Sequence, residues 1–134
     1  MAVKAKTFAY EIALDREGRA SAEGGEARDF GEEWTPEHLV LAGLARCSVT
    51  SLRYFAKQRR LDVTAEASAS GKVTAREDGR YGFVELEVRI DVELDTVPED
   101  LHALLERAEW GCFVGASLTP KPTYSWRVNG NDAR

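Results

Sequence analysis

The segment Thr35-Pro-Glu-His-Leu-Val-Leu-Ala-Gly-Leu-Ala-Arg-Cys47 contains the clearest helix start in this 134-residue sequence. Its threonine can cap a helix, its proline suits the first helical position, and its glutamate places negative charge in the first turn. Over residues 39–55, apolar side chains occupy most sides of the predicted helix. A helix that is apolar nearly all round is buried nearly all round. We therefore expect a long central helix, ending near Arg60, that is wrapped by a sheet and by a second subunit.

Before this helix, the sequence predicts short strands and turns. Residues 4–14 alternate loosely between apolar and polar side chains, and they predict a first strand. The turn that follows contains Gly18, which can adopt a positive φ. Weaker patterns predict a second strand over residues 19–22 and a third over residues 26–30.

After the helix, the sequence predicts a long β-hairpin. Residues 61–75 and 83–92 read as its two strands, and Glu77-Asp-Gly79 forms the turn between them. Side chains of a strand alternate between its two faces, so one face of the second strand is expected to be apolar and to face the core. This face comprises Val84, Leu86, Val88, Ile90 and Val92.

A second helix and a closing strand complete the predicted fold. The helix is expected to open at Pro98 and to run to about Ala108, with Trp110-Gly-Cys112 at or just past its end and a turn region at Ser117 and Leu118. Residues 124–128 read as the last strand. Strands, helix, hairpin, helix and strand in this order predict an α+β fold, with one domain spanning residues 1–134.

The composition limits the possible partners. The net charge is -5 and the sequence pI is about 5.1, so nucleic acid is a poor partner. No signal peptide is evident at Met1-Ala-Val-Lys4, and no apolar run approaches the length of a membrane span. We therefore expect a cytoplasmic protein, in which a disulfide is more often catalytic than structural. A chain of this size gains burial from dimerisation.

The two cysteines, Cys47 and Cys112, allow two interpretations. Cys47 lies in the middle of the predicted helix among apolar residues, and Cys112 lies beside Trp110. Each can be a small buried hydrophobic residue, which is the common state of free cysteine. The alternative is a redox pair. Two cysteines are too few for a structural zinc site, and His38 and His102 show no ligand-like spacing to them, so we expect no metal.

A redox pair needs a thiolate and a cation that stabilises it. The thiolate is the nucleophile, and its oxidation yields a sulfenic acid that a second cysteine converts to a disulfide. We interpret Arg46 and Arg53, which flank Cys47 along the helix, as solvent-facing charges. The residues alone do not choose among the available arginines, which are Arg16, Arg19, Arg28, Arg46 and Arg53.

These segments together resemble the OsmC/Ohr family of bacterial hydroperoxide reductases. The segment from Thr35 to Cys47 is similar to the family's Pro-Glu pair, long helix and cysteine. Cys112-Phe-Val-Gly-Ala-Ser-Leu118 is similar to its second cysteine segment, although proline often follows that cysteine in the family. The N-terminal Arg16-Glu-Gly-Arg-Ala resembles the turn that carries the catalytic arginine in the Ohr branch. The resemblance covers essentially the whole chain.

The resemblance implies a fold and a mechanism. The fold would be antiparallel sheets around a long central helix in an intertwined homodimer. Cys47 would attack an organic hydroperoxide, and Cys112 would then form a disulfide with it. An external dithiol, of lipoyl type in the Ohr branch, would reduce the disulfide without a bound cofactor. Arg16, ahead of Arg19 and Arg28, would favour the thiolate, and Glu37 would hold that arginine by a charge-assisted hydrogen bond.

The spacing of Glu37 and Cys47 predicts a site shared by two subunits. The two residues are ten positions apart, which on one straight helix is roughly 15 Å of rise. They cannot share a small active site within one chain unless the helix breaks. We therefore predict that each site takes Glu37 from one protomer and Cys47 from the other.

Two further interpretations remain open at this stage. The chain could be a non-catalytic OsmC-like protein that binds a small apolar ligand at the dimer interface, because a fold does not fix a function. It could also be a structural or stress-response interaction protein whose cysteines are only packed in the core. The first of these is favoured by Phe113, which stands where proline is common in the family.

Overall fold

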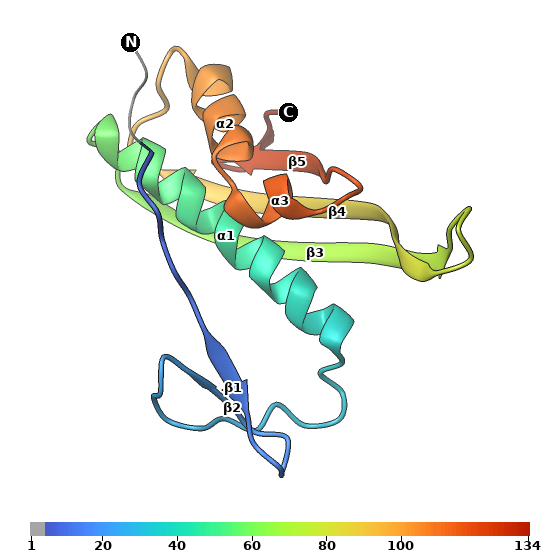
Figure 1. The fold of residues 1–134 in the computed structure, drawn as a ribbon. Coiled ribbons are helices and arrows are strands. Elements are labelled where there is room, and N and C mark those ends of the chain that lie inside the picture. The colour runs from blue at the N-terminus through green and yellow to red at the C-terminus, as the bar shows by residue number, and fades with distance from the viewer. Residues whose placement is uncertain (1–4) are drawn as a thin grey trace. The chain divides into compact units, whose positions relative to one another are not determined.

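The computed structural model describes residues 5–134 and divides the chain into two compact units, Met1–Thr35 and Pro36–Arg134. The chain contains both strands and helices, in the order that the sequence predicts for a mixed architecture (Figure 1). The α+β class is therefore confirmed. The assignment of the whole chain to a single domain stays a prediction.

The N-terminal unit contains a two-stranded antiparallel sheet. Strand β1, Ile12–Leu14, pairs with β2, Ala20–Ala22, across a turn in which Gly18 has the expected positive φ of 82°. The first strand is shorter than predicted, and the start of its predicted range, at residue 4, lies outside the described residues. The expected third strand is reduced to one bridge between Ala20 and Arg28.

Exposure gives the physical reason for these short strands. Apolar side chains of this unit face solvent within the single chain, among them Phe8 at 58% exposure, Tyr10 at 78% and Ile12 at 70%. A two-stranded ribbon without a covered apolar face is at best marginal in water. The alternation in the sequence therefore marks apolar side chains that remain largely exposed among the described residues of this unit.

The C-terminal unit is a four-stranded sheet with helices on one of its faces (Figure 1). Its helices are α1 (Pro36–Gln58), α2 (Leu101–Trp110) and α3 (Phe113–Ser117). Its strands are β3 (Val63–Ala75), β4 (Tyr81–Leu94), β5 (Thr123–Val128) and β6 (Asn131–Asp132), hydrogen-bonded in the order β3-β4-β5-β6.

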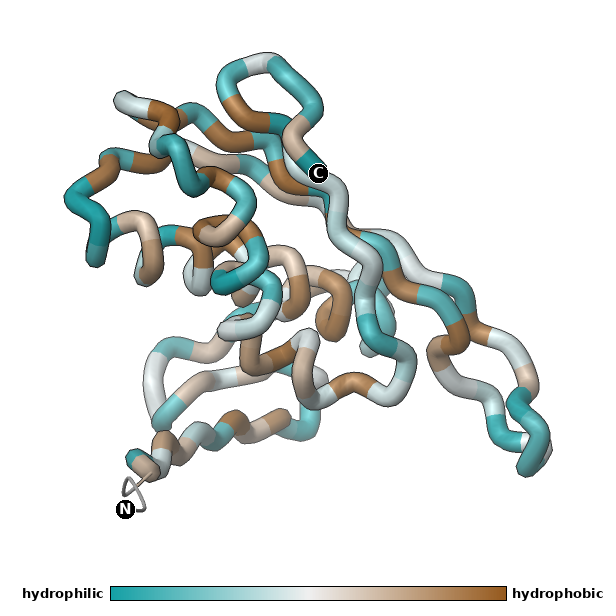
Figure 2. Tube along the Cα trace, turned by 90° about the horizontal axis from the view of Figure 1, so that it is seen from above, coloured by the Kyte–Doolittle hydropathy of each residue, from teal (hydrophilic) through white to brown (hydrophobic). Residues whose placement is uncertain are grey.

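The sheet is mixed, and the expectation of purely antiparallel sheets was wrong in this respect. Strands β3 and β4 form the predicted antiparallel hairpin, whose turn is hydrophilic (Figure 2). Strand β5 instead runs parallel to β4. The reason is the segment between them, because α2 and α3 form a crossover that returns the chain to the end of the sheet where β4 began.

The core lies between this sheet and the helices. Leu44, Leu52 and Ala56 of α1 are fully buried, and so are Leu104 and Leu105 of α2. The sheet contributes Leu86, Val88, Ile90, Val92, Trp126 and Val128. These side chains form one contiguous apolar cluster with Cys112, which places the second cysteine inside the core.

Helix α1 is buried along one face in the single chain, and the expected burial of its other sides by a second subunit stays a prediction. Leu39 and Val40 near its start are exposed, and Tyr54 on its last turns is 60% exposed. The sheet and the other helices contact only the opposite side. Any burial of the remaining apolar face must come from outside this unit.

A β-bulge changes one position of the predicted core face. The register between β3 and β4 shifts at Lys72 and Val73, so that Val73 pairs with Phe83 while Lys72 pairs with Glu85. Val84 is the extra residue, and it is 43% exposed. Beyond the bulge, the predicted face from Leu86 to Val92 is buried as expected. A bulge places two residues opposite one and thereby moves later side chains to the other face.

The helix boundaries follow local signals. Helix α1 starts at Pro36 as predicted, and after Gln58 it closes with Arg60 at a positive φ of 58° and a hydrogen bond from the Leu61 N–H to the Ala56 carbonyl. Helix α2 begins at Leu101 rather than at Pro98, because Asp100 is its N-cap and its carbonyl accepts the first helical hydrogen bonds.

Candidate active site around Cys47 and Cys112

Cys47 lies in the middle of α1 on the side that faces α3. Its side chain is half-buried, and its sulfur accepts a hydrogen bond from the backbone N–H of Val114 at 3.5 Å. The position follows from helix periodicity, because Cys47 is adjacent to the face that carries Leu44 and Ser48 into the core. The first turn of α3 therefore rests against the middle of α1.

Cys112 is fully buried and caps α3. It is the N-cap residue, and its sulfur accepts a hydrogen bond from the backbone N–H of Gly115 at 3.4 Å. The Ser48 hydroxyl oxygen lies 3.7 Å from the same sulfur. Helix α3 lies where the sequence predicts a turn region, begins just after the second cysteine, and presents its N–H groups to both sulfurs.

Cys112 lies close enough to Cys47 to affect the ionisation of the Cys47 thiol. Burial raises the pKa of the Cys47 thiol above its ordinary value, and the neighbouring Cys112 thiol raises it further. The hydrogen bonds from the Val114 and Phe113 backbone act in the opposite direction. No cation is among the groups that most affect this pKa. Burial thus favours the thiol form of Cys47, and a positive charge close to its sulfur would favour the thiolate.

A third side chain completes the buried cluster. The hydroxyl of Tyr124, on β5, lies beside this cluster, because a Cβ atom added at Gly115 would lie 2.7 Å from it and 3.4 Å from the Cys112 sulfur. Burial, and then the neighbouring Cys112, raise the pKa of Tyr124 far above its ordinary value. The phenol therefore keeps its proton and can act as a hydrogen-bond donor.

Glu37 lies away from Cys47 along α1. It is exposed in the first turn, and the helix is unbroken from Pro36 to Gln58. The rise over ten residues of α-helix is roughly 15 Å. One chain therefore cannot bring Glu37 to its own Cys47. Arg46 and Arg53 are exposed, as their interpretation as solvent-facing charges requires, and His38 and His102 are exposed as well.

The N-terminal arginines differ in how they are engaged within their own unit. Arg19 donates to Asp15 at 2.9 Å, and its backbone N–H donates to the same carboxylate, which lowers the pKa of Asp15. Arg16 sits in the same turn, is exposed, and forms no ion pair within residues 5–134. Arg28 is exposed, with its backbone paired to Ala20. Within residues 5–134, neither Arg16 nor Arg28 has an ion pair, whereas Arg19 supports the turn.

The family model of OsmC-like proteins matches residues 29–127, a range that includes both cysteines and all of α1. The chain belongs to the OsmC-like family. Among curated proteins, none matches the sequence. No helix within the described part of the chain combines the length and apolar character that a membrane crossing requires.

Solved structures with the same fold include OsmC-like proteins of two kinds. An organic hydroperoxide resistance protein from Elizabethkingia anophelis is 18% identical, with a TM-score of 0.66 over 94% of this chain and 99% of that one. Its counterpart from Bacillus subtilis is also 18% identical, with a TM-score of 0.58 over 91% and 98%. An OsmC-like protein of unknown function from Vibrio cholerae is 14% identical, with a TM-score of 0.72 over 91% and 99%. At these identities the likeness shows the fold alone.

The sequence reading of this OsmC-like protein missed Ser48, Tyr124 and the N–H groups of α3. Ser48 could have been recognised from the sequence, because a serine on an otherwise apolar helix face needs a hydrogen-bond partner when it is buried. Its hydroxyl donates to the Leu44 carbonyl at 2.8 Å. Tyr124 could not have been recognised from the sequence, because its position near Cys112 depends on the parallel pairing of β5 with β4.

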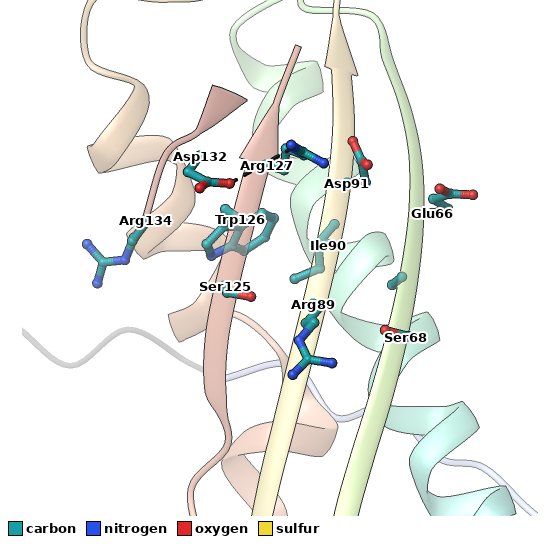
Figure 3. Close-up of a pocket in the computed structure, with 11 residues that line it drawn as sticks. Glu66, Ser68, Arg89, Ile90, Asp91, Ser125, Trp126, Arg127, Asp132 and Arg134 are labelled. Atoms are coloured by element: carbon teal, nitrogen blue, oxygen red, sulfur yellow. Dashed lines mark ion pairs between the residues drawn. The ribbon is translucent and has the colours of Figure 1, made fainter. Parts of the chain in front are cut away.

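A pocket of about 780 Å³ lies elsewhere on the OsmC-like fold, on the sheet face opposite the helices (Figure 3). Its lining mixes charges of both signs, among them Arg89, Asp91 and Arg127, and Arg127 pairs with Asp132 at 3.9 Å. Neither cysteine lines it. We therefore place the candidate site at the cysteine pair rather than in this open, charged hollow.

Proposed function

We propose that this protein is a thiol peroxidase that reduces organic hydroperoxides to alcohols. The observation that carries the proposal is the pairing of a half-buried cysteine with a fully buried one, 65 positions apart in the chain, across the first turn of α3. A half-buried sulfur can be reached by a substrate, and a buried neighbour can resolve its oxidised form. Membership of the OsmC-like family and the fold of the hydroperoxide resistance proteins support it.

The proposed cycle has three steps. The Cys47 thiolate attacks the outer peroxide oxygen, the O–O bond breaks, and the alkoxide leaves and takes up a proton to become an alcohol. Cys47 is then a sulfenic acid. The Cys112 thiol condenses with it, forming a disulfide and releasing water. An external dithiol, of lipoyl type, reduces the disulfide and is itself oxidised to a cyclic disulfide.

The proposal assigns the missing positive charge to Arg16. Burial and Cys112 raise the pKa of Cys47, so a thiolate at neutral pH needs a nearby cation. Arg16 has a guanidinium without an ion pair in the described part of the chain, and it occupies the turn that resembles the family's arginine turn. It would also hold the peroxide oxygens. Glu37 would orient Arg16 by a charge-assisted hydrogen bond.

The proposed assembly is an intertwined homodimer with composite sites. The unbroken α1 separates Glu37 from Cys47 of the same chain. The exposed apolar residues Leu39 and Val40 on α1, and Phe8 and Tyr10 in the N-terminal unit, offer a surface that a second copy would bury. Each site would then combine Cys47 of one protomer with Glu37 of the other, in a cytoplasmic enzyme.

A cysteine substitution tests the function. We expect Cys47→Ser to abolish consumption of cumene hydroperoxide in the presence of a dithiol. Without added thiol, Cys112→Ser should consume one equivalent of peroxide and form a Cys47 sulfenic acid but no intramolecular disulfide. Equal consumption by wild type and Cys47→Ser would refute the peroxidase and leave a non-catalytic OsmC-like protein as the interpretation. Circular dichroism provides the control that both variants are folded.

A further inference from the structure

We propose that Ser48 is a positioning residue that accepts the S–H proton of Cys112, stabilises the reduced cysteine pair and thereby makes its disulfide easier to reduce. This inference rests on the proposed disulfide cycle and adds to it a residue that sets the balance between dithiol and disulfide. It stands on the hydrogen bonds of the two sulfurs and on the direction of one of them.

The single proton of the Ser48 hydroxyl fixes the direction of its contact with Cys112. The hydroxyl oxygen lies 3.7 Å from the Cys112 sulfur, a contact in which either atom could be the donor. The same hydroxyl donates to the Leu44 carbonyl at 2.8 Å, and a hydroxyl has only one proton to donate. Towards the sulfur it can therefore only accept, so the S–H group of Cys112 is the donor.

Burial gives this hydrogen bond its weight. Both Ser48 and Cys112 are buried in the core between α1 and the sheet. A buried donor that loses its acceptor cannot turn to bulk water, so the cost falls on the state that carries the donor. Because S–H is a weak donor, we expect the effect of this one bond to be modest.

The other hydrogen bonds of the two sulfurs do not depend on a thiol proton. The backbone N–H of Gly115 donates to Cys112 at 3.4 Å, and that of Val114 donates to Cys47 at 3.5 Å. In both bonds the sulfur is the acceptor, and a disulfide sulfur still has lone pairs. The bond to Ser48 instead needs the proton of the Cys112 thiol, which the disulfide lacks. It is therefore lost on oxidation.

The redox balance shows which state this bond favours. Oxidation of the pair removes two protons and two electrons and forms one S–S bond between Cys47 and Cys112. A reagent such as glutathione disulfide takes them up, and its own S–S bond breaks to give two thiols. The bond to Ser48 exists only on the dithiol side, so it raises the reduction potential of the pair. Reduction by the external dithiol of the proposed cycle becomes more favourable.

A redox titration tests this role. The protein is equilibrated with mixtures of reduced and oxidised glutathione or dithiothreitol, and alkylation followed by mass spectrometry gives the disulfide fraction. We expect Ser48→Ala to favour the disulfide about threefold, which lowers the reduction potential by about 14 mV. Loss of packing alone would weaken both redox states and leave the potential unchanged.

Ser51→Ala is the matched control for the titration. Ser51 is a second buried serine of α1, and its hydroxyl donates to the Ala108 carbonyl at 2.7 Å. Its removal should therefore cost stability without moving the reduction potential. An unchanged potential in Ser48→Ala, or an equal change in Ser51→Ala, would overturn the role of Ser48.

Infrared spectroscopy reads the direction of the hydrogen bond. In a Cys47→Ser background, Cys112 is the one remaining thiol of the chain, so its S–H stretching band stands alone. Adding Ser48→Ala should move this band to higher wavenumber, because an S–H bond strengthens when its acceptor is removed. Adding Ser51→Ala should leave the band in place. A band that Ser48→Ala does not move would refute Cys112 as the donor.

The outcomes separate this inference from the proposed function, because neither experiment uses a hydroperoxide. Failure of the wild type to consume hydroperoxide would count against the peroxidase alone. If the redox mixtures never join Cys47 to Cys112 in the wild type, both the disulfide cycle and this role of Ser48 are refuted.

Discussion

Val114 donates its backbone N–H to the sulfur of Cys47 at 3.5 Å, and it lies two residues after Cys112, whose own sulfur caps the same helix. A five-residue helix thus holds two cysteines that are distant in sequence. Backbone N–H groups of α3 donate to both sulfurs, and one of these sulfurs belongs to its N-cap residue, Cys112. Helix α3 therefore brings the surroundings of both sulfurs together at the edge of the apolar core.

The charge on Cys47 should depend on Arg16. A cation favours the thiolate and lowers the pKa of a thiol, so Arg16→Gln should raise it by about one to three units. The pH profile of iodoacetamide alkylation of Cys47 measures this shift. The variant should react more slowly at neutral pH and should approach the wild type at high pH. Arg19→Gln is the control, since Arg19 is tied to Asp15. Superimposable profiles for Arg16→Gln and wild type would exclude Arg16 as the cation.

The composite site can be tested by complementation between two inactive variants. Glu37→Gln and Cys47→Ser homodimers should both be strongly impaired. In a mixed dimer, one site combines both altered residues and the other combines both native ones, so activity should return to about half of the wild-type level for each mixed dimer. Co-expression with two affinity tags isolates the mixed species. If both residues acted within one protomer, the mixed dimer would gain nothing over its parents.

Gly115 leaves the space in which the Tyr124 hydroxyl lies. A Cβ at this position would be 2.7 Å from that hydroxyl and 3.4 Å from the Cys112 sulfur. Gly115→Ala should therefore crowd the buried cluster and lower the free energy of unfolding by about 1–3 kcal/mol. Gly43→Ala on α1 is the matched control, because an added Cβ there meets nothing within 4 Å, and it should be at least as stable as the wild type. Urea denaturation measures both, and equal free energies of unfolding for all three proteins would contradict this role of Gly115.

The β-bulge predicts different costs for two valines of β4. Val88 is fully buried, whereas Val84 is 43% exposed. Replacing valine by threonine keeps the shape and adds a hydroxyl, which costs about 1–3 kcal/mol when it is buried without a partner. We expect a loss of this size in the free energy of unfolding for Val88→Thr, and a change of less than about 0.5 kcal/mol for Val84→Thr. Urea denaturation measures both, and similar losses would place Val84 in the core.

Local signals allowed much of the fold to be predicted from the sequence. Helix α1 begins at Pro36 because its capping signals lie within one turn, and the β3–β4 hairpin follows from alternation around Gly79. Helix α3 escaped prediction because a five-residue helix has too little periodicity to recognise. Without α3, the crossover and the parallel pairing of β5 could not be anticipated. The bulge at Val84 depends on cross-strand register, which one strand does not encode alone.

Some residues of the candidate site could be predicted from the sequence, and others could not. Cys47 and Cys112 could be paired in advance only through their resemblance to a family, because residues alone allowed both cysteines to be simply buried. Tyr124 could not be found, since its position near Cys112 arises from the parallel strand. The separation of Glu37 and Cys47 within one chain could be predicted from their spacing, because an unbroken helix fixes it.

The central claim is that Cys47 and Cys112 turn over as a redox pair, and a thiol count tests it most directly. The reduced protein has two thiols per chain. The account predicts that one equivalent of cumene hydroperoxide removes both, with peptide mapping showing an intramolecular disulfide between Cys47 and Cys112. Two thiols remaining after the peroxide is added, with no disulfide in the peptide map, would contradict the account.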